Sequence, residues 1–216
     1  MPRKSVPGVA RGAHRRVFFQ SVRTKESAVE SKAVFLDRDK TILLPEGGER
    51  YIYRVGDFYV PENYVEALRL LKDRGYLLFV VTNQSRVASG HLTETDVNEL
   101  HNYLDLILEE RGVYIEEYAY CPHNPRGTVS PYNMACICRK PRTGMIDALS
   151  KKHGVDRQRS WMVGDSDIDM IAGKKAGLRT VQVLTGWDLY SHYADYIERD
   201  FAAAAERIAA EGEGRD

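Results

Sequence analysis

The sequence predicts an α/β protein built on a doubly wound parallel sheet. Short apolar runs with the length of buried strands alternate with longer segments of helical periodicity. Polar residues directly follow several of these runs, at the strand ends where open parallel sheets place their chemistry. The chain has 216 residues, of which 43% are hydrophobic and 29% charged, so it is long enough for one domain with a full core.

The first predicted strand covers residues 33–36, four apolar residues that are too few for a helical pattern. A hairpin or an aromatic flap is expected around Tyr51, Tyr53 and residues 58–60. The other strands are expected at residues 77–81, 114–120, 160–163, 180–184 and, at an edge, 196–197. Helices are expected at residues 63–75, 93–111, 144–153, 168–176 and 201–210. Thr93 with Asp96 forms a capping-box pattern, and Gly75 and Gly177 are suited to helix ends.

Composition narrows the classes of partner. The formal net charge is zero, so no overall field attracts nucleic acid or anionic membranes. No apolar run is long enough to span a bilayer. Three cysteines are an odd number for a disulfide framework, which favours a reducing, cytoplasmic setting. A monomer is expected.

Residues 1–30 differ from the rest because they are basic and contain no acidic residue before Glu26. Such a segment could be a transit peptide or an arm for an anionic partner, but a disordered tail or an extended start of the reading frame is favoured. The folded domain is therefore expected to cover residues 31–211, and no function is assigned to the tail.

Asp37 and Asp39 follow the first strand with one residue between them, so both side chains lean to one side of an extended segment. Two carboxylates this close repel each other unless a cation or a shared proton intervenes. A simple turn is the alternative, because Asp is common in turns.

Two later strand ends carry related polar groups. Thr82 and Asn83 follow the second long strand, and Asp165, Asp167 and Asp169 open a helix after residues 160–163. One Asp would suffice to cap that helix. The additional carboxylates, at strand ends that converge on one crevice, indicate a hard cation, and Mg²⁺ is the expected ion.

Arg139 and Lys140 add positive charge ahead of that strand. An exposed Lys is more often only a solvated charge, but a crevice that binds phosphate needs a cation opposite the metal. Carboxylate, metal, Thr hydroxyl and Lys together indicate phosphoryl chemistry.

Cys121 and His123 form one pair of potential metal ligands, and Cys136 and Cys138 form another. Each pair has one residue between its members, and the four donors suit a closed tetrahedral Zn²⁺ site that orders an otherwise irregular loop at about residues 119–140. Three unrelated buried cysteines beside a surface His are the alternative, which leaves the paired spacing as coincidence.

Six segments recur in the same order as in a known family. They are residues 35–41 (FLDRDKT), 81–85 (VTNQS), 121–123 (CPH), 136–141 (CICRKP), 144–145 (GM) and 163–165 (VGD). Over about residues 33–187 the chain resembles the haloacid dehalogenase superfamily. Within it the chain is similar to the D-glycero-D-manno-heptose 1,7-bisphosphate phosphatases and their relatives, the histidinol-phosphate phosphatases. The resemblance implies a Rossmann-like core with a zinc loop in place of a large cap domain.

The resemblance also implies roles for individual residues. Asp37 would be the nucleophile that forms an aspartyl-phosphate, and Asp39 the general acid and then base. Mg²⁺ would be held by Asp37, Asp165 and the backbone carbonyl of Asp39, with Asp169 supporting these ligands from behind. Thr82 and Lys140 would bind the phosphoryl oxygens. Substrate-binding residues would be Arg38, Tyr51, Asn83, Gln84, Ser85 and Arg139.

Four residues depart from the family pattern. Lys40 and Arg86 each stand where Gly is usual, Ser166 replaces a Lys that often follows the metal-binding Asp, and His91 stands near an expected Arg-Gly pair. None of them removes a catalytic atom. They affect the choice of substrate more than the reaction.

The leading hypothesis is therefore a Mg²⁺-dependent phosphatase of a small phosphorylated metabolite, with heptose 1,7-bisphosphate, cleaved at position 7, as the best single substrate. A histidinol-phosphate phosphatase is the alternative. A polynucleotide 3′-phosphatase is disfavoured by the zero net charge and the zinc loop. A non-catalytic binding module is disfavoured because both Asp37 and Asp39 are present.

Overall fold

The structure, a computed structural model, describes residues 30–188 and 190–213. The predicted tail lies outside the described residues, apart from Glu30. No helix within the described residues is long and apolar enough to cross a membrane.

In the described part of the chain, six strands form one sheet in the order β5-β4-β1-β6-β7-β8, and every neighbouring pair is parallel. The strands are β1 (Ala33–Leu36), β4 (Leu77–Asn83), β5 (Glu117–Cys121), β6 (Trp161–Gly164), β7 (Arg179–Val183) and β8 (Tyr196–Glu198). Strand β4 lies on one side of β1 and β6 lies on the other, so the connections reverse direction at β1. Ligand sites in open α/β sheets form at the carboxyl ends of strands at such a reversal.

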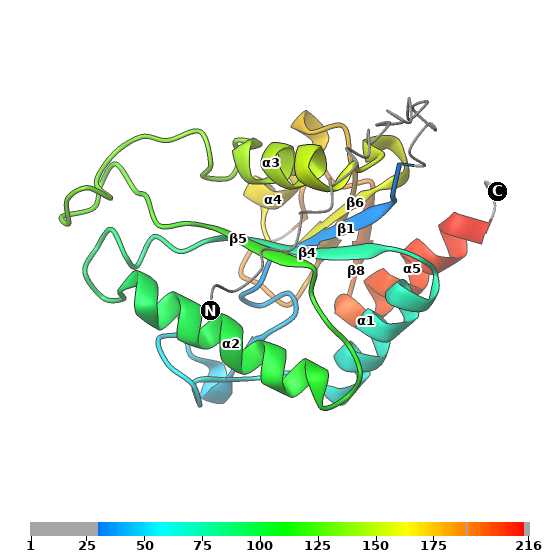
Figure 1. The fold of residues 1–216 in the computed structure, drawn as a ribbon, viewed down its shortest axis with the longest axis horizontal. Helices are drawn as coiled ribbons and strands as arrows, with labels where there is room; N and C mark the ends of the chain where they lie inside the picture. Colours follow the sequence, from blue (N-terminus) through cyan, green and yellow to red (C-terminus); the bar gives the residue numbers. More distant parts are fainter. Residues whose placement is uncertain (1–29, 189, 214–216) are drawn as a thin grey trace, which may run out of the picture.

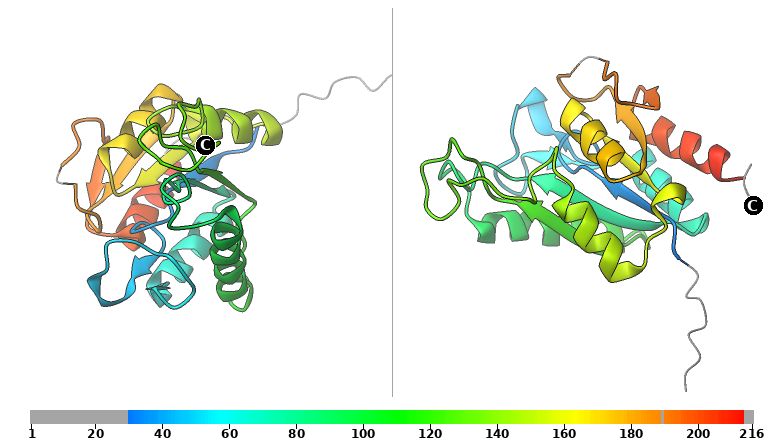
Figure 2. Two further views of the ribbon diagram at one scale, coloured as in Figure 1. Left: turned by 90° about the vertical axis from the view of Figure 1, so that its left-hand side faces the viewer. Right: turned by 90° about the horizontal axis from the view of Figure 1, so that it is seen from above.

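Helices cover both faces of the sheet (Figures 1 and 2). One face carries α1 (Glu62–Asp73), α2 (Glu94–Glu109) and α5 (Phe201–Glu213), and the other carries α3 (Gly144–His153) and α4 (Asp167–Lys175). Strand β1 supplies both cores, because Val34 and Leu36 pack on the first side while Ala33 and Phe35 pack on the second. The predicted doubly wound α/β class is confirmed.

The predicted elements are present with shifted ends. The Thr93–Asp96 capping box at the start of α2 is confirmed. Strand β4 runs two residues further than expected, since Thr82 and Asn83 pair with β5. Strand β5 begins only at Glu117, because the residues before it close the end of α2, where the Val113 amide donates to the Leu108 carbonyl (3.0 Å). Helix α5 continues past the expected domain end at residue 211.

The segment between β1 and α1 forms a hairpin, but only its second strand lies where one was expected, because the first precedes Tyr51 and Tyr53. Its short strands β2 (Leu44–Pro45) and β3 (Phe58–Tyr59) pair antiparallel, with the short 3₁₀ helix η1 (Glu46–Gly48) after β2. A second 3₁₀ helix, η2 (Arg157–Arg159), precedes β6. Between β5 and α3 the described residues form no helix or strand, so this insertion is a loop rather than a cap domain.

Candidate active site

The carboxyl ends of β1, β4 and β6 open into one cavity of about 450 Å³. Asp37 and Asp39 come from the turn after β1, Thr82 from the end of β4 and Asp165 from the residue after β6. Lys140 enters from the loop that precedes α3. The same cavity is also lined by Lys40, Tyr51, Asn83, Gln84, Ser85, Arg86, Arg139, Ser166, Asp169 and Trp187.

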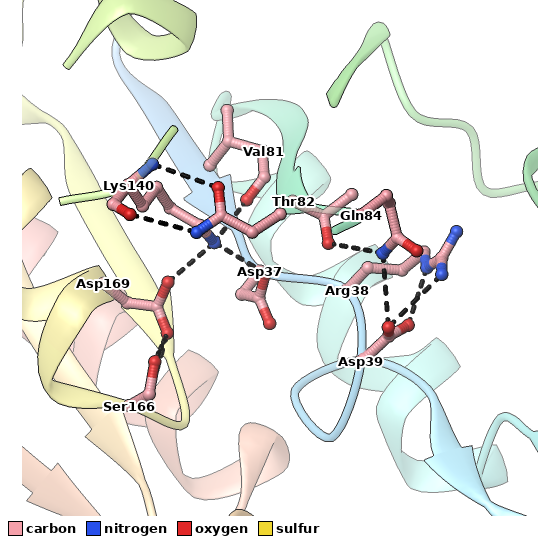
Figure 3. A network of polar contacts seen from close by, with 10 residues as sticks. Asp37, Arg38, Asp39, Val81, Thr82, Gln84, Lys140, Ser166 and Asp169 are labelled. Carbon is pink, nitrogen blue, oxygen red and sulfur yellow. Dashed lines mark hydrogen bonds and ion pairs between the residues drawn. The ribbon is translucent and has the colours of Figure 1, made fainter. Parts of the chain in front are cut away.

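Lys140 is the centre of the polar network (Figure 3). Its side chain is buried, and its Nζ lies 2.6 Å from Asp37 Oδ1, 2.6 Å from Asp169 Oδ1 and 2.6 Å from the Val81 carbonyl oxygen. Burial would lower the pKa of Lys140, but the charges of Asp169 and Asp37 outweigh it and raise the pKa. The ammonium therefore stays charged and fixed beside Asp37.

Asp37, Asp165 and Asp169 crowd together, with one oxygen of each lying within 4.8 Å of the others. Burial raises the pKa of Asp37 to about 6, with Lys140 opposing and Asp169 and Asp39 adding to the shift. Burial, followed by the charges of Asp37 and Asp169, raises the pKa of Asp165 to about 8. A divalent cation would relieve this repulsion, and a set of carboxylate oxygens fits Mg²⁺.

Asp169 combines a helix cap with an ion pair. Its Oδ2 accepts hydrogen bonds from the Ser166 hydroxyl (2.5 Å) and amide (3.2 Å), while Oδ1 faces Lys140. Asp169 therefore caps the start of α4, as the alternative explanation requires, and it also takes part in the polar network of the cavity. Asp167 turns away and accepts a hydrogen bond from the Ser191 hydroxyl instead.

Asp39 is held by its neighbour Arg38. Arg38 Nε lies 2.7 Å from Asp39 Oδ1 and Nη2 lies 3.3 Å from Oδ2, while the Gln84 amide donates to Oδ2 (3.2 Å) and to Thr82 Oγ1 (3.0 Å) (Figure 3). Burial would raise the pKa of Asp39, but the charge and hydrogen bonds of Arg38 and the bond from Gln84 together lower it.

The expectation that Arg38 contacts substrate needs correction. Its side chain is 0% exposed and does not line the cavity, because the turn after β1 directs it beneath Asp39. Arg38 therefore supports Asp39 from below and is not part of the cavity wall.

Asn83 lines the cavity but also fixes Lys140. Its Nδ2 donates to the Lys140 carbonyl (3.1 Å), and its Oδ1 accepts from the Lys140 amide (3.0 Å). Tyr51 also lines the cavity, and the guanidinium of Arg86 lies over its ring, 3.5 Å from the centroid.

Sequence reasoning missed Gly186 and Trp187. A Cβ on Gly186 would lie 2.1 Å from Asp165 Oδ2, so only glycine allows this approach to the carboxylate. Trp187 follows it and faces Lys40, with the Lys40 Nζ 5.0 Å from the ring centroid. The Thr-Gly-Trp segment after β7 resembles an ordinary loop, and only the fold brings it to the cavity.

The four predicted zinc ligands lie together. Cys121 Sγ is 3.4 Å from Cys136 Sγ, 3.2 Å from Cys138 Sγ and 3.6 Å from His123 Nδ1. Bonds of about 2.3 Å to a tetrahedral zinc would put neighbouring ligands about 3.8 Å apart, so these spacings are close to a closed site. The cluster could hold one metal ion.

The loop that carries these ligands is tied to the rest of the site. Arg139 Nη1 donates to the His123 carbonyl (3.2 Å), which joins the loop to the residue before Lys140. On its other side, the phenols of Tyr120 and Tyr132 each donate to Glu94 at the start of α2 (both 2.6 Å). These bonds lower the pKa of Glu94. We call Glu94, Tyr120 and Tyr132 the loop clamp.

Comparisons with known proteins agree with this geometry. A family model described as HAD-hydrolase-like matches residues 137–207. The chain is 42% identical over 157 residues to a D-glycero-beta-D-manno-heptose-1,7-bisphosphate 7-phosphatase of Haemophilus ducreyi, covering 72% of this chain and 84% of that protein. It is 39% identical over 155 residues to the Escherichia coli K12 protein of the same name, covering 71% and 80%.

Solved structures give the same result. A putative HAD-like phosphatase from Mesorhizobium loti superposes with a TM-score of 0.73 at 28% identity, covering 87% of this chain and 89% of that one. The D,D-heptose 1,7-bisphosphate phosphatase of B. bronchiseptica, complexed with magnesium and phosphate, gives 0.71 at 25% identity, covering 83% and 99%.

Proposed function

The chain belongs to the haloacid dehalogenase-like phosphatases, and from this premise we propose that it hydrolyses a sugar phosphate, with D-glycero-D-manno-heptose 1,7-bisphosphate as the substrate and the 7-phosphate as the group removed. The observation that carries the proposal is the contact of the Lys140 ammonium with Asp37, 2.6 Å away, beside Asp165 and Asp169. This arrangement combines a nucleophile, a fixed cation and a set of metal ligands in one cavity. The named relatives support the choice of substrate.

In the first step, an Asp37 oxygen attacks phosphorus while the bond between phosphorus and the sugar oxygen breaks. Asp39 gives a proton to the departing sugar oxygen, and Asp37 carries the phosphoryl group. Asp39 must be protonated for this step. A phosphate dianion beside it favours the protonated form, since like charges raise a carboxyl pKa.

In the second step, Asp39 takes a proton from a water that attacks the same phosphorus. The bond to Asp37 breaks, and inorganic phosphate and the free carboxylate are formed. The hydrogen bonds from Arg38 and Gln84 that lower the pKa of Asp39 suit this half of the reaction.

Phosphoryl oxygens are bound by Thr82 and Lys140 in this scheme. Bound to Asp37, Asp165 and the backbone carbonyl of Asp39, Mg²⁺ would neutralise part of the charge on those oxygens. Asp169 orients Lys140 and supports the ligands. Tyr51, Asn83, Gln84, Ser85 and Arg139 form the walls that receive the sugar.

We propose that the Cys/His cluster holds a structural Zn²⁺ in a loop at about residues 119–140, and that residues 31–211 act as one phosphatase domain. A zinc site built on thiolates suits the reducing cytoplasm. We propose a monomer that binds neither membranes nor nucleic acid.

The test is phosphate release from heptose 1,7-bisphosphate, histidinol phosphate and a 3′-phosphorylated oligonucleotide, each with and without Mg²⁺. The bisphosphate should be the preferred substrate and should require Mg²⁺. Asp37→Asn should lower turnover at least about 10³-fold, because the carboxylate nucleophile is lost. Asp73→Asn, at the end of α1 away from the cavity, is the control. Unchanged turnover in Asp37→Asn would refute the mechanism, and preference for another ester would refute the substrate.

A further inference from the structure

Lys40 has a backbone conformation that its side chain disfavours. With φ at +62°, it is the one non-glycine residue with positive φ in the described part of the chain. Its amide donates to the Leu43 carbonyl (2.7 Å), and its carbonyl accepts a hydrogen bond from the Thr185 hydroxyl, so the turn enforces this conformation. Glycine adopts it without strain. Strained residues that persist beside a catalytic cavity indicate a use for the side chain.

The Lys40 ammonium has a defined position at the cavity wall. It lies over the Trp187 ring, 5.0 Å from the centroid, and both residues line the cavity that holds Asp37 and Asp165. Trp187 is 65% exposed, so the pair lies at the rim rather than on the floor. Among the described residues, no carboxylate forms an ion pair with Lys40. Its charge acts at longer range on Asp165, where it opposes the rise of the pKa, but no direct carboxylate contact competes with an anionic group on a substrate.

The cation on the floor of the cavity is already engaged. Lys140 contacts Asp37, Asp169 and the Val81 carbonyl, and it lies beside the residues that act on the transferred phosphoryl group. Lys40 comes from the same turn as Asp37 but faces Trp187, which follows β7 at the side of the sheet away from β4. A second anionic group on the substrate would meet Lys40 while the first occupies the floor.

We propose that Lys40, supported by Trp187, binds a second phosphate group that is not transferred, and that it thereby selects bisphosphates over monophosphates. This inference rests on the proposed function and deepens it. Lys40 is then a specificity-determining residue. The chain keeps a lysine in a glycine-like conformation because its charge recognises the substrate.

The experiment compares heptose 1,7-bisphosphate with heptose 7-phosphate, two substrates that differ only in the second phosphate. Lys40→Met removes the charge but keeps the strained backbone, while Lys40→Gly removes both. In each variant the ratio of kcat/KM for the bisphosphate to that for the monophosphate should fall about tenfold, the size of one charge-assisted contact. The loss should appear in KM. The melting temperature of Lys40→Gly should be no lower than that of the wild type.

Lys151→Met, an exposed lysine of α3 outside the cavity lining, is the matched control. Equal losses for both substrates would overturn the inference by showing that Lys40 acts on the transferred group. An unchanged ratio would also overturn it, and a fall of that ratio in Arg86→Met alone would assign the second phosphate to the Arg86–Tyr51 side. Failure of the wild type to hydrolyse the bisphosphate would instead refute the proposed function itself.

Discussion

Arg38 and Asp39 are consecutive residues whose side chains form a two-pronged ion pair, with Nε 2.7 Å from Oδ1 and Nη2 3.3 Å from Oδ2. The guanidinium is fully buried while the carboxylate remains partly exposed to the cavity. Arg38 Nη1 has no hydrogen-bond partner among the described residues. The arrangement positions Asp39 at the cost of burying a charge that is only partly satisfied.

Arg38→Met should separate activity from stability. Asp39 would lose the group that orients it but keep its carboxyl, so kcat should fall about tenfold to a hundredfold, less than the full contribution of acid–base catalysis. The melting temperature should change by only a few degrees, because the Asp39 carboxylate that loses its partner is 34% exposed and can be solvated, while an apolar side chain of similar length fills the buried site of Arg38. Steady-state kinetics and thermal unfolding measure the two effects, with exposed Arg69→Met as the control. Normal kcat would show that Arg38 does not position Asp39.

Loss of the proposed zinc ion should lower the phosphatase activity, although the Cys/His cluster is separate from the carboxylates of the cavity. Lys140 follows Cys138 by two residues, and Arg139 donates to the His123 carbonyl, so a disordered loop would displace the two residues proposed to contact the substrate and its phosphate. Cys138→Ser should lower the zinc content from about one ion per chain towards zero and reduce activity in excess Mg²⁺ about tenfold or more.

Ile137→Ser is a matched control for this experiment, since it introduces the same residue at the adjacent position, which is 79% exposed. Metal analysis and phosphate release are measured on the same samples. A zinc-free wild-type protein with full activity would contradict both the metal and its role.

The loop clamp should contribute pH-dependent stability. Hydrogen bonds from Tyr120 and Tyr132 lower the pKa of Glu94 in the folded state, so their contribution is present above the ordinary Glu pKa and is lost as the pH falls through the folded-state value. Glu94→Gln should lower the free energy of unfolding by about 1 kcal/mol at pH 7, a value that allows for partial solvent exposure. Urea unfolding measures the difference in free energy of unfolding between the wild type and Glu94→Gln. This difference should be smaller at pH 4 than at pH 7. A constant difference would show that charge plays no part.

His101 should make the fold sensitive to mild acid. Burial, assisted by the charge of Arg38 and opposed by Asp39, lowers its pKa to about 3, and its ring stacks on Tyr118 with centroids 4.5 Å apart. The unfolded chain takes up a proton near pH 6.5, whereas the folded protein does not, so stability falls as the pH falls between these values. Below pH 6, the contribution of His101 to the slope of the unfolding free energy against pH should approach about 1.4 kcal/mol per pH unit.

His101→Phe retains the ring stack and should remove this slope from urea unfolding curves collected between pH 4 and pH 7. His192→Phe, at an exposed position, should leave the slope unchanged. Identical slopes in the wild type and His101→Phe would contradict the assignment.

The ends of the strands were predictable from the sequence, because buried parallel strands appear as short apolar runs. The polar residues that follow such runs lie at the same edge of the sheet, the one formed by the carboxyl ends of the strands. Asp37, Thr82 and Asp165 could therefore be grouped without coordinates. The position of Arg38 was not predictable, since its side chain is directed inward by a tight turn in which the amides of Thr41, Ile42 and Leu43 all donate to the Arg38 carbonyl, and the sequence carries no signal for that turn. Trp187 and Gly186 carry no pattern of their own, and only the packing of the loop after β7 brings them to Asp165.

The three contacts of Lys140 also connect distant parts of the chain. Its backbone belongs to the loop that carries the Cys/His cluster, while its ammonium reaches the end of β1, the β4 backbone and the start of α4. These groups come from four segments spread over residues 37–169, so a form in which any one of these segments is unfolded lacks part of the cavity. In a denaturant titration, the loss of phosphate release should therefore coincide with global unfolding, and catalytic turnover becomes a direct reporter of cooperative folding.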